Sequence, residues 1–126
     1  MAYGDIGGPI TELVMTCRTK ASGAVSIRRG DALSLTGPYT VDNAAAEGGP
    51  VLGQALADCD RNGAPLAVRL RGVCDFPYTG AAPVPDGITG VAASATAGRV
   101  KTPAVGTGRG IVLHTDTAGE KVHVLI

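Results

Sequence analysis

The 126-residue sequence has few aromatic residues: three tyrosines, one phenylalanine and no tryptophan. Proteins that bind single-stranded nucleic acids or sugars by stacking use aromatic platforms, so this class of function is disfavoured. An excess of either charge is also lacking, because 11 Lys and Arg residues balance 11 Asp and Glu residues. Nucleic-acid-binding proteins are normally basic, so we expect no nucleic-acid partner.

Long hydrophobic runs are absent too. No run approaches the roughly 20 apolar residues that a membrane-spanning helix needs, so no membrane partner is expected. The first residues contain no basic region followed by an apolar one, and the sequence predicts no secretory signal. The three cysteines, Cys17, Cys59 and Cys74, lack the C-x-x-C spacing of a metal site. Their odd number and wide spacing indicate reduced, partly buried thiols in a protein assembled inside a cell.

Glycine, by contrast, is abundant, with 19 residues. Small residues allow tight turns and close strand packing, but they make a thin core. At this length we expect a single β-rich domain over residues 11–126, burying roughly two-thirds of its unfolded surface. A thin core in a short chain indicates that stability is gained by association with partners or with other copies.

One hairpin pattern occurs twice, in residues 56–70 and again in residues 112–126. Each copy reads strand, Asp-x-x-Gly, strand, with the turns at residues 60–63 and 116–119. Asp can accept a hydrogen bond from the turn backbone and Gly tolerates a positive φ, so the pattern predicts type I turns that close hairpins. Apolar residues alternate after each turn, which predicts one buried face per strand. These residues are Leu66, Val68 and Leu70 in the first copy and Val122, Val124 and Ile126 in the second.

The rest of the chain predicts short strands and loops. Residues 11–19 indicate a first strand, and alternating apolar pairs at 25–27 and 33–35 indicate two more. Residues 43–47 have the composition of one helical turn. A Pro- and Gly-rich stretch at residues 77–87 predicts a surface or contact loop.

Residues 1–10 are predicted to form an extended arm, because four of them are Gly or Pro. Tyr3, Ile6 and Ile10 give this arm apolar anchors. The predicted fold class is therefore all-β (mainly β): a small β-barrel or sandwich of short hairpins, with an extended N-terminal arm and at most one short helix.

Two segments carry residues that could bind a ligand. His114 and His123 flank the last turn and, with Asp116, could form a metal pair or a pH-sensitive contact. Because no third ligand is well placed, we favour the interpretation that both histidines are solvent-facing strand residues and not a metal pair. The Gly-rich segment 106–110 resembles a phosphate-binding loop, but a strand follows it and no Lys-Ser/Thr completes the motif. We favour an inter-strand loop there.

Two further motifs have a plain structural interpretation. Residues 29–31 spell the adhesion triplet Arg-Gly-Asp, which is also a good turn between strands, and we favour the turn. Cys59 could be a nucleophile, but the carboxylates of Asp58 and Asp60 on either side disfavour a reactive thiolate. The sequence predicts no catalytic residue, no cofactor site and no metal site.

Five segments together have the layout of a known group of proteins. They are the Gly-rich arm at residues 1–10, the strand at 30–37, the segments 53–58 and 66–77, and the closing hairpin. In this layout the chain resembles the small β-rich head proteins of tailed bacteriophages, known as capsid decoration, cement or head-stabilising proteins.

The resemblance implies a structural virion protein and not an enzyme. Such a protein binds the outer surface of the mature capsid, after assembly in the host cytoplasm, and bridges subunits of the major capsid protein. It acts as a homo-oligomer, commonly a trimer, with a dimer as the other option. Tyr3, Ile6 and Ile10 would then be capsid-binding residues. Many weak sites that bridge subunits would stabilise the lattice by mass action.

Two other classes of function stay open: a small ligand-binding barrel and a carrier module of the lipoyl or biotinyl type. A carrier needs a lysine exposed at a hairpin tip, whereas the first tip has Arg61 and Lys121 lies past Gly119. A ligand-binding barrel would have a polar-lined pocket with perturbed titratable groups.

Overall fold

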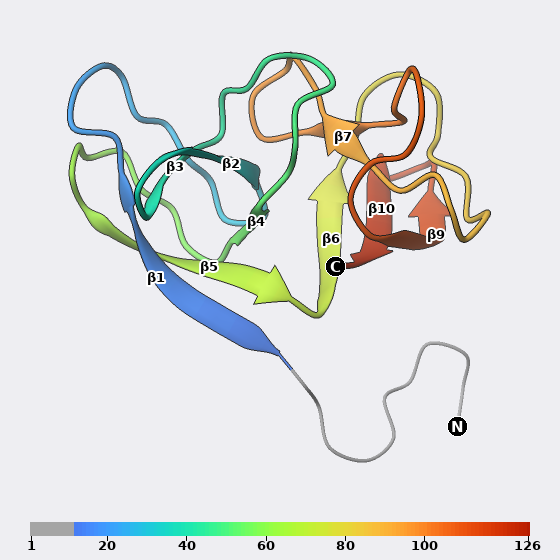
Figure 1. Ribbon diagram of the computed structural model, residues 1–126, viewed down its shortest axis with the longest axis horizontal. Helices are drawn as coiled ribbons and strands as arrows, with labels where there is room; N and C mark the ends of the chain where they lie inside the picture. The colour runs from blue at the N-terminus through green and yellow to red at the C-terminus, as the bar shows by residue number, and fades with distance from the viewer. Residues whose placement is uncertain (1–11) are drawn as a thin grey trace.

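The computed structural model describes residues 12–126, and in this part of the chain it contains ten strands and no helix (Figure 1). The first five strands are β1 (Leu13–Thr19), β2 (Ala32–Gly37), β3 (Thr40–Asp42), β4 (Gly53–Ala55) and β5 (Pro65–Arg71). The others are β6 (Val73–Pro77), β7 (Ala92–Ala93), β8 (Val100–Lys101), β9 (Ile111–Asp116) and β10 (Lys121–Leu125).

The all-β class predicted from the sequence is confirmed. The helical turn predicted at residues 43–47 is wrong: this stretch is irregular and leads into a turn at Glu47 and Gly48, where the positive φ of Gly48 (82°) reverses the chain. The predicted arm, with Tyr3, Ile6 and Ile10, lies outside the described residues. Within residues 12–126 there is no helix of the length and apolar character needed to cross a membrane.

Strands β1 to β5 form a closed barrel in the order β1-β3-β2-β4-β5 (Figure 1). β1 closes it by pairing in parallel with β3 on one side and antiparallel with β5 on the other. Closure leaves these strands without the free edges that favour pairing with another chain. The buried side chains of the barrel core are Cys17, Val25, Ile27, Leu33, Val41, Ala55, Leu66 and Val68.

The C-terminal half of the chain builds a second core on a three-stranded sheet in the order β6-β10-β9. β10 pairs antiparallel with both neighbours. Val122, Val124 and Ile126 are buried, as their alternation predicts. β7 and β8 form a separate two-stranded sheet that adds Ala93 and Val100 to the same core.

The second copy of the repeated pattern forms the predicted hairpin, β9–β10. The Asp116 Oδ1 atom accepts a hydrogen bond from the N–H of Gly119 (3.2 Å), as an Asp at the start of a turn should. The positive φ falls on Glu120 (53°) and not on the glycine.

The first copy does not form a tight hairpin, and this prediction is wrong. The strand before the turn ends at Ala55, and residues 56–64 form a loop. The loop is drawn out because Cys59 exchanges two main-chain hydrogen bonds of 2.9 Å with Ile27. Val25 and Ile27, predicted as strand residues, are buried in the barrel core, and of the two only Ile27 forms a β-bridge.

Arg109 joins the barrel to the second core. Its guanidinium donates hydrogen bonds to the carbonyl oxygens of Val51 (3.1 Å) and Leu52 (2.9 Å), just before β4, and of Leu70 (2.9 Å) on β5. Burial lowers the pKa of Arg109, and the nearby charge of Arg71 lowers it further. A planar guanidinium carries five N–H donors in a fixed arrangement, so one side chain can satisfy carbonyls from two separate segments.

Gln54 makes a second link between the two units. Its amide nitrogen donates to the Asp75 carbonyl on β6 (2.7 Å), and its oxygen accepts from Arg69 on β5 (3.1 Å). Arg69 also pairs with Glu12 (2.8 Å), and this hydrogen bond raises the pKa of Arg69. The contact between the two cores therefore contains polar groups with matched partners.

The loop between β6 and β7 is closed by Asp86. Its carboxylate accepts hydrogen bonds from the main-chain N–H groups of Ile88 (2.9 Å) and Thr89 (2.8 Å) and from the Thr89 hydroxyl. These bonds lower the pKa of Asp86 to about 2. Hydrogen bonds to the charged form of a carboxyl group have this effect.

Replacement of Arg109 by Met is expected to destabilise the fold by roughly 2–4 kcal/mol, because three carbonyl groups lose a charged donor. Arg71→Met is the matched control, since Arg71 is exposed and makes no such bonds. Urea unfolding monitored by circular dichroism gives the midpoints. Equal midpoints for the two variants would contradict this role of Arg109.

The Asp86 carboxyl group is expected to titrate near pH 2, well below the ordinary value of about 3.9. Because the folded-state pKa is lowered, its contribution to stability is fully present above about pH 4 and is lost as the pH falls through about 2. NMR titration of Asp86 checks this. In Thr89→Val, which loses the hydroxyl donor, the midpoint should rise; an unchanged midpoint would refute the contribution of the Thr89 hydroxyl.

Candidate interaction surfaces

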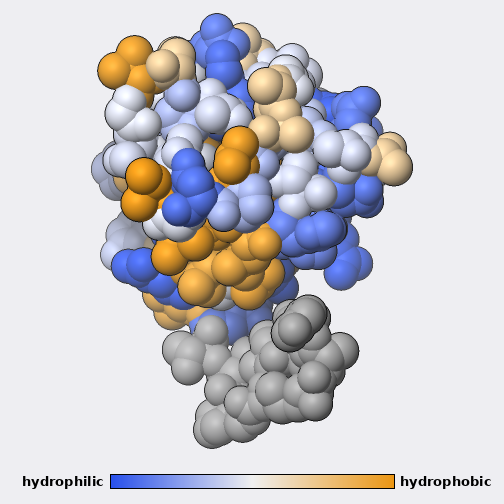
Figure 2. Space-filling view, turned by 90° about the vertical axis from the view of Figure 1, so that its right-hand side faces the viewer, coloured by the Kyte–Doolittle hydropathy of each residue, from blue (hydrophilic) through white to orange (hydrophobic). Residues whose placement is uncertain are grey.

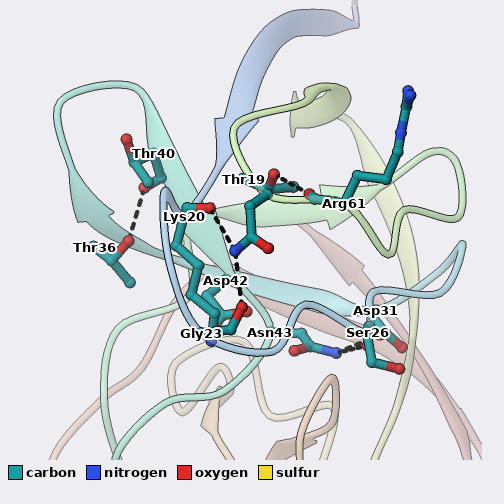
Figure 3. Close-up of polar contacts among 11 residues, drawn as sticks. Thr19, Lys20, Gly23, Ser26, Asp31, Thr36, Thr40, Asp42, Asn43 and Arg61 are labelled. Carbon is teal, nitrogen blue, oxygen red and sulfur yellow. Dashed lines mark hydrogen bonds and ion pairs between the residues drawn. The ribbon is translucent and has the colours of Figure 1, made fainter.

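One end of the barrel is closed by a polar network from the loops that follow β1 and β3 and precede β5 (Figure 3). Lys20 forms an ion pair with Asp42 (3.0 Å). The Asn62 amide donates to the Lys20 carbonyl (3.1 Å), and the Asn43 amide donates to the Asp31 carboxylate (2.9 Å). Each of these groups has a partner, so the network holds loops together and presents no free reactive group.

The Arg-Gly-Asp triplet is a turn, as predicted. The Asp31 carboxylate accepts from the Arg28 N–H (2.9 Å) as well as from Asn43, so it is used inside the fold. The Arg29 N–H donates to Asp58 (2.7 Å). The Asp31 carboxylate and the Arg29 main chain therefore take part in holding the turn within the fold.

The Gly-rich segment 106–110 is an inter-strand loop that leads into β9, which confirms the interpretation favoured from the sequence. The N–H of Gly108 donates to the Thr89 carbonyl (2.7 Å). A Cβ atom at Gly108 would collide with the Val91 carbonyl. Close backbone packing, and not anion binding, explains this glycine.

His114 and His123 are direct cross-strand partners on β9 and β10. Their ring centroids lie 5.5 Å apart in an edge-to-face arrangement. Both are exposed strand residues, as favoured from the sequence, and His123 also faces Asp75 on β6. Within residues 12–126 no group of three His, Cys, Asp or Glu side chains is placed to hold a metal ion.

The three cysteines are free thiols. Cys17 and Cys74 are buried, and burial raises the pKa of both thiols, for Cys74 to about 11. The guanidinium groups of Arg69 and Arg109 act in the opposite direction at Cys74 but do not outweigh burial. Neither buried thiol is therefore a reactive thiolate at neutral pH.

Exposed apolar side chains gather on the outer face of the β6-β10-β9 sheet. Val73, Leu125 and Ile111 are paired across the three strands and form a row. They are 42%, 43% and 43% exposed. Leu113, the extra residue of a bulge in β9, is 48% exposed. Figure 2, which faces the side of the molecule that carries β9, shows apolar side chains gathered low on this side.

A row of polar residues runs beside the apolar row on the same face. Asp75, His123 and His114 are paired across the strands in that order. We call the two rows together the outer sheet face. The sequence indicated the histidine pair, but not the apolar row, because the row depends on β6 and β9 lying on opposite sides of β10.

A groove of about 590 Å³ lies between the loops at residues 48–51 and 103–109. Its walls are mostly Gly, Pro, Ala and Val, and Arg109 is its one charged lining residue among the described residues. Within residues 12–126 no carboxylate pairs with Arg109. Three of its five N–H donors bind main-chain carbonyls, and the other two have no partner among residues 12–126.

By sequence, no protein family model matches the chain, and no curated protein matches it. By structure, the chain is similar to the N base of the head fiber gp8.5 of bacteriophage phi29. The similarity covers 92% of this chain and 94% of that one, with a TM-score of 0.62 and 18% sequence identity. At this identity the similarity shows a shared fold.

Proposed function

We propose that the protein is a structural component of a phage virion that attaches to the outer surface of the head as an oligomer. The observation that supports this best is the structural similarity to the N base of a phage head fiber along nearly the whole of both chains. The sequence layout independently resembles that of phage decoration proteins.

The chemistry of the described residues agrees with a role in binding. The polar groups at the barrel end are paired, and the buried thiols have raised pKa values. Within residues 12–126 the outer sheet face and the groove offer surface for contacts and no set of groups arranged for catalysis. A protein of zero formal net charge also suits contact with other proteins better than contact with packaged DNA.

Attachment to a capsid would work by mass action. A protein that binds only the assembled lattice stabilises it, and many weak sites that bridge subunits of the major capsid protein add to one another. In this proposal the arm at residues 1–10 makes the capsid contact, with Tyr3, Ile6 and Ile10 as anchors. An extended segment can bind as an added strand or in a groove.

Deletion of residues 1–10 is expected to lower the affinity for phage heads at least about tenfold, as should the triple change of Tyr3, Ile6 and Ile10 to Ala. Co-sedimentation with heads assembled without this protein measures the occupancy. Leu35→Asp is the matched control, because Leu35 is an exposed apolar residue of the barrel. Occupancy that is the same with and without the arm would refute its role.

The groove supports a second candidate function, the binding of a small apolar anion. A groove of this volume suits a small ligand, and the two remaining N–H donors of Arg109 suit a carboxylate. The carrier alternative has less support, because Lys121 is half-buried and paired with Asp116 in the ladder of β10. A modified lysine would have to be free at a hairpin tip.

Octanoate is the probe for this second function, and at saturation it is expected to raise the melting temperature by roughly 2–4 °C. Ala104→Trp should abolish the shift, because residue 104 lines the groove and takes no part in the Arg109 hydrogen bonds. Ala81→Trp, on another exposed loop, is the control. No shift at millimolar octanoate, or the same shift in Ala104→Trp, would exclude this function.

A further inference from the structure

The outer sheet face has no partner within residues 12–126, although a sheet of this kind normally covers its apolar positions. We propose that this face binds the same face of a second copy of the chain, related by a two-fold axis that runs along β10. The inference deepens the proposed function, on which it rests, by naming the surface through which copies of the virion protein meet.

The apolar row provides the centre of such a contact. Val73, Leu125 and Ile111 lie side by side across the sheet, and Leu113 extends the row at the edge strand. From their exposed fractions, the four side chains present about 300 Å² of apolar surface, which is within the range of the largest apolar patch on a typical soluble monomer, a patch that often has a function. Isolated exposed residues such as Leu35 do not form a row of this kind.

The register of the sheet makes the face complementary to itself. β10 is the central strand, so a two-fold axis along it exchanges β6 and β9 between the two copies. Val73 of one copy then faces Ile111 of the other, and Leu125 faces Leu125. The apolar row meets the apolar row, as in the packing of two sheets in a β-sandwich.

The polar row favours the same arrangement. The axis places Asp75 of one copy opposite His114 of the other, at both ends of the row. An imidazole N–H can donate to a carboxylate, so each dimer would contain two hydrogen bonds between His114 of one copy and Asp75 of the other. Zero formal net charge means that two copies do not repel each other over longer distances.

The size of the face sets the strength of the contact. The apolar row, at about 300 Å² per copy, is well below the roughly 800 Å² per partner of a standard stable interface. A second copy is a better occupant than an unrelated protein, because one chain provides the complement to both the apolar row and the Asp75–His114 contacts. The contact should therefore form and dissociate with concentration in the free protein.

The test is the mass of the full chain in solution, measured by sedimentation equilibrium from micromolar to millimolar concentration. We expect a monomer–dimer equilibrium. Leu125→Asp should weaken it at least about tenfold, because two charges would meet at the axis, whereas Leu35→Asp should change it by less than about twofold. Circular dichroism checks that each variant folds.

Charge exchange tests the two-fold arrangement itself. Asp75→Lys and His114→Glu should each weaken association, because each removes the donor–acceptor contact, and the double variant should restore it, because each dimer then has two Lys–Glu contacts. A monomer at every concentration, a mass unaffected by Leu125→Asp, or a double variant as weak as the singles would overturn the proposal. These measurements use no phage heads, so their failure removes this two-fold contact, whereas attachment to the head is decided separately by co-sedimentation.

Discussion

The two halves of this protein meet at one guanidinium group that binds three main-chain carbonyls. Arg109 comes from the loop before β9, and its partners lie before β4 and at the end of β5. Gln54 and main-chain bonds, such as that from the Ala32 N–H to the Gly98 carbonyl (2.8 Å), add further links between the halves. Arg109 differs from these because it brings a half-buried charge to the joint. The cost of its partial burial is offset by matching three of its donors to carbonyl oxygens.

The two units differ in the strand edges and sheet faces that they leave open. The five barrel strands pair with one another in a closed ring, so the barrel has no free strand edge for pairing with another chain. The second sheet turns its buried face toward its own core and leaves its other face open. The outer face of this sheet therefore carries the paired row of exposed apolar side chains, whereas the barrel strands have no free edge.

Local patterns in the sequence predicted the structure where contacts are local. The alternation in β10 indicated the buried residues correctly. The last hairpin formed with Asp116 bonded to its turn as predicted, but the positive φ lies on Glu120 and not on the glycine. The first hairpin failed because Cys59 pairs with Ile27, which lies far back in the chain in a loop that forms no extended strand.

Contacts between distant segments could not be predicted in this way. Arg109 could not be identified, because its partners are 39 to 58 residues away and are carbonyls, which every residue carries. The outer sheet face depends on the order β6-β10-β9, and the alternation of buried and exposed residues along each strand does not reveal that order.

The bulge in β9 has a consequence for how this surface can evolve. Leu113 is the extra residue opposite the His123–Val124 step, so it adds a side chain to the exterior while the pairing on both sides of it is kept. Selection can therefore alter this position without a compensating change in the core, and lineages that share the fold but little sequence could acquire new partners there, one substitution at a time.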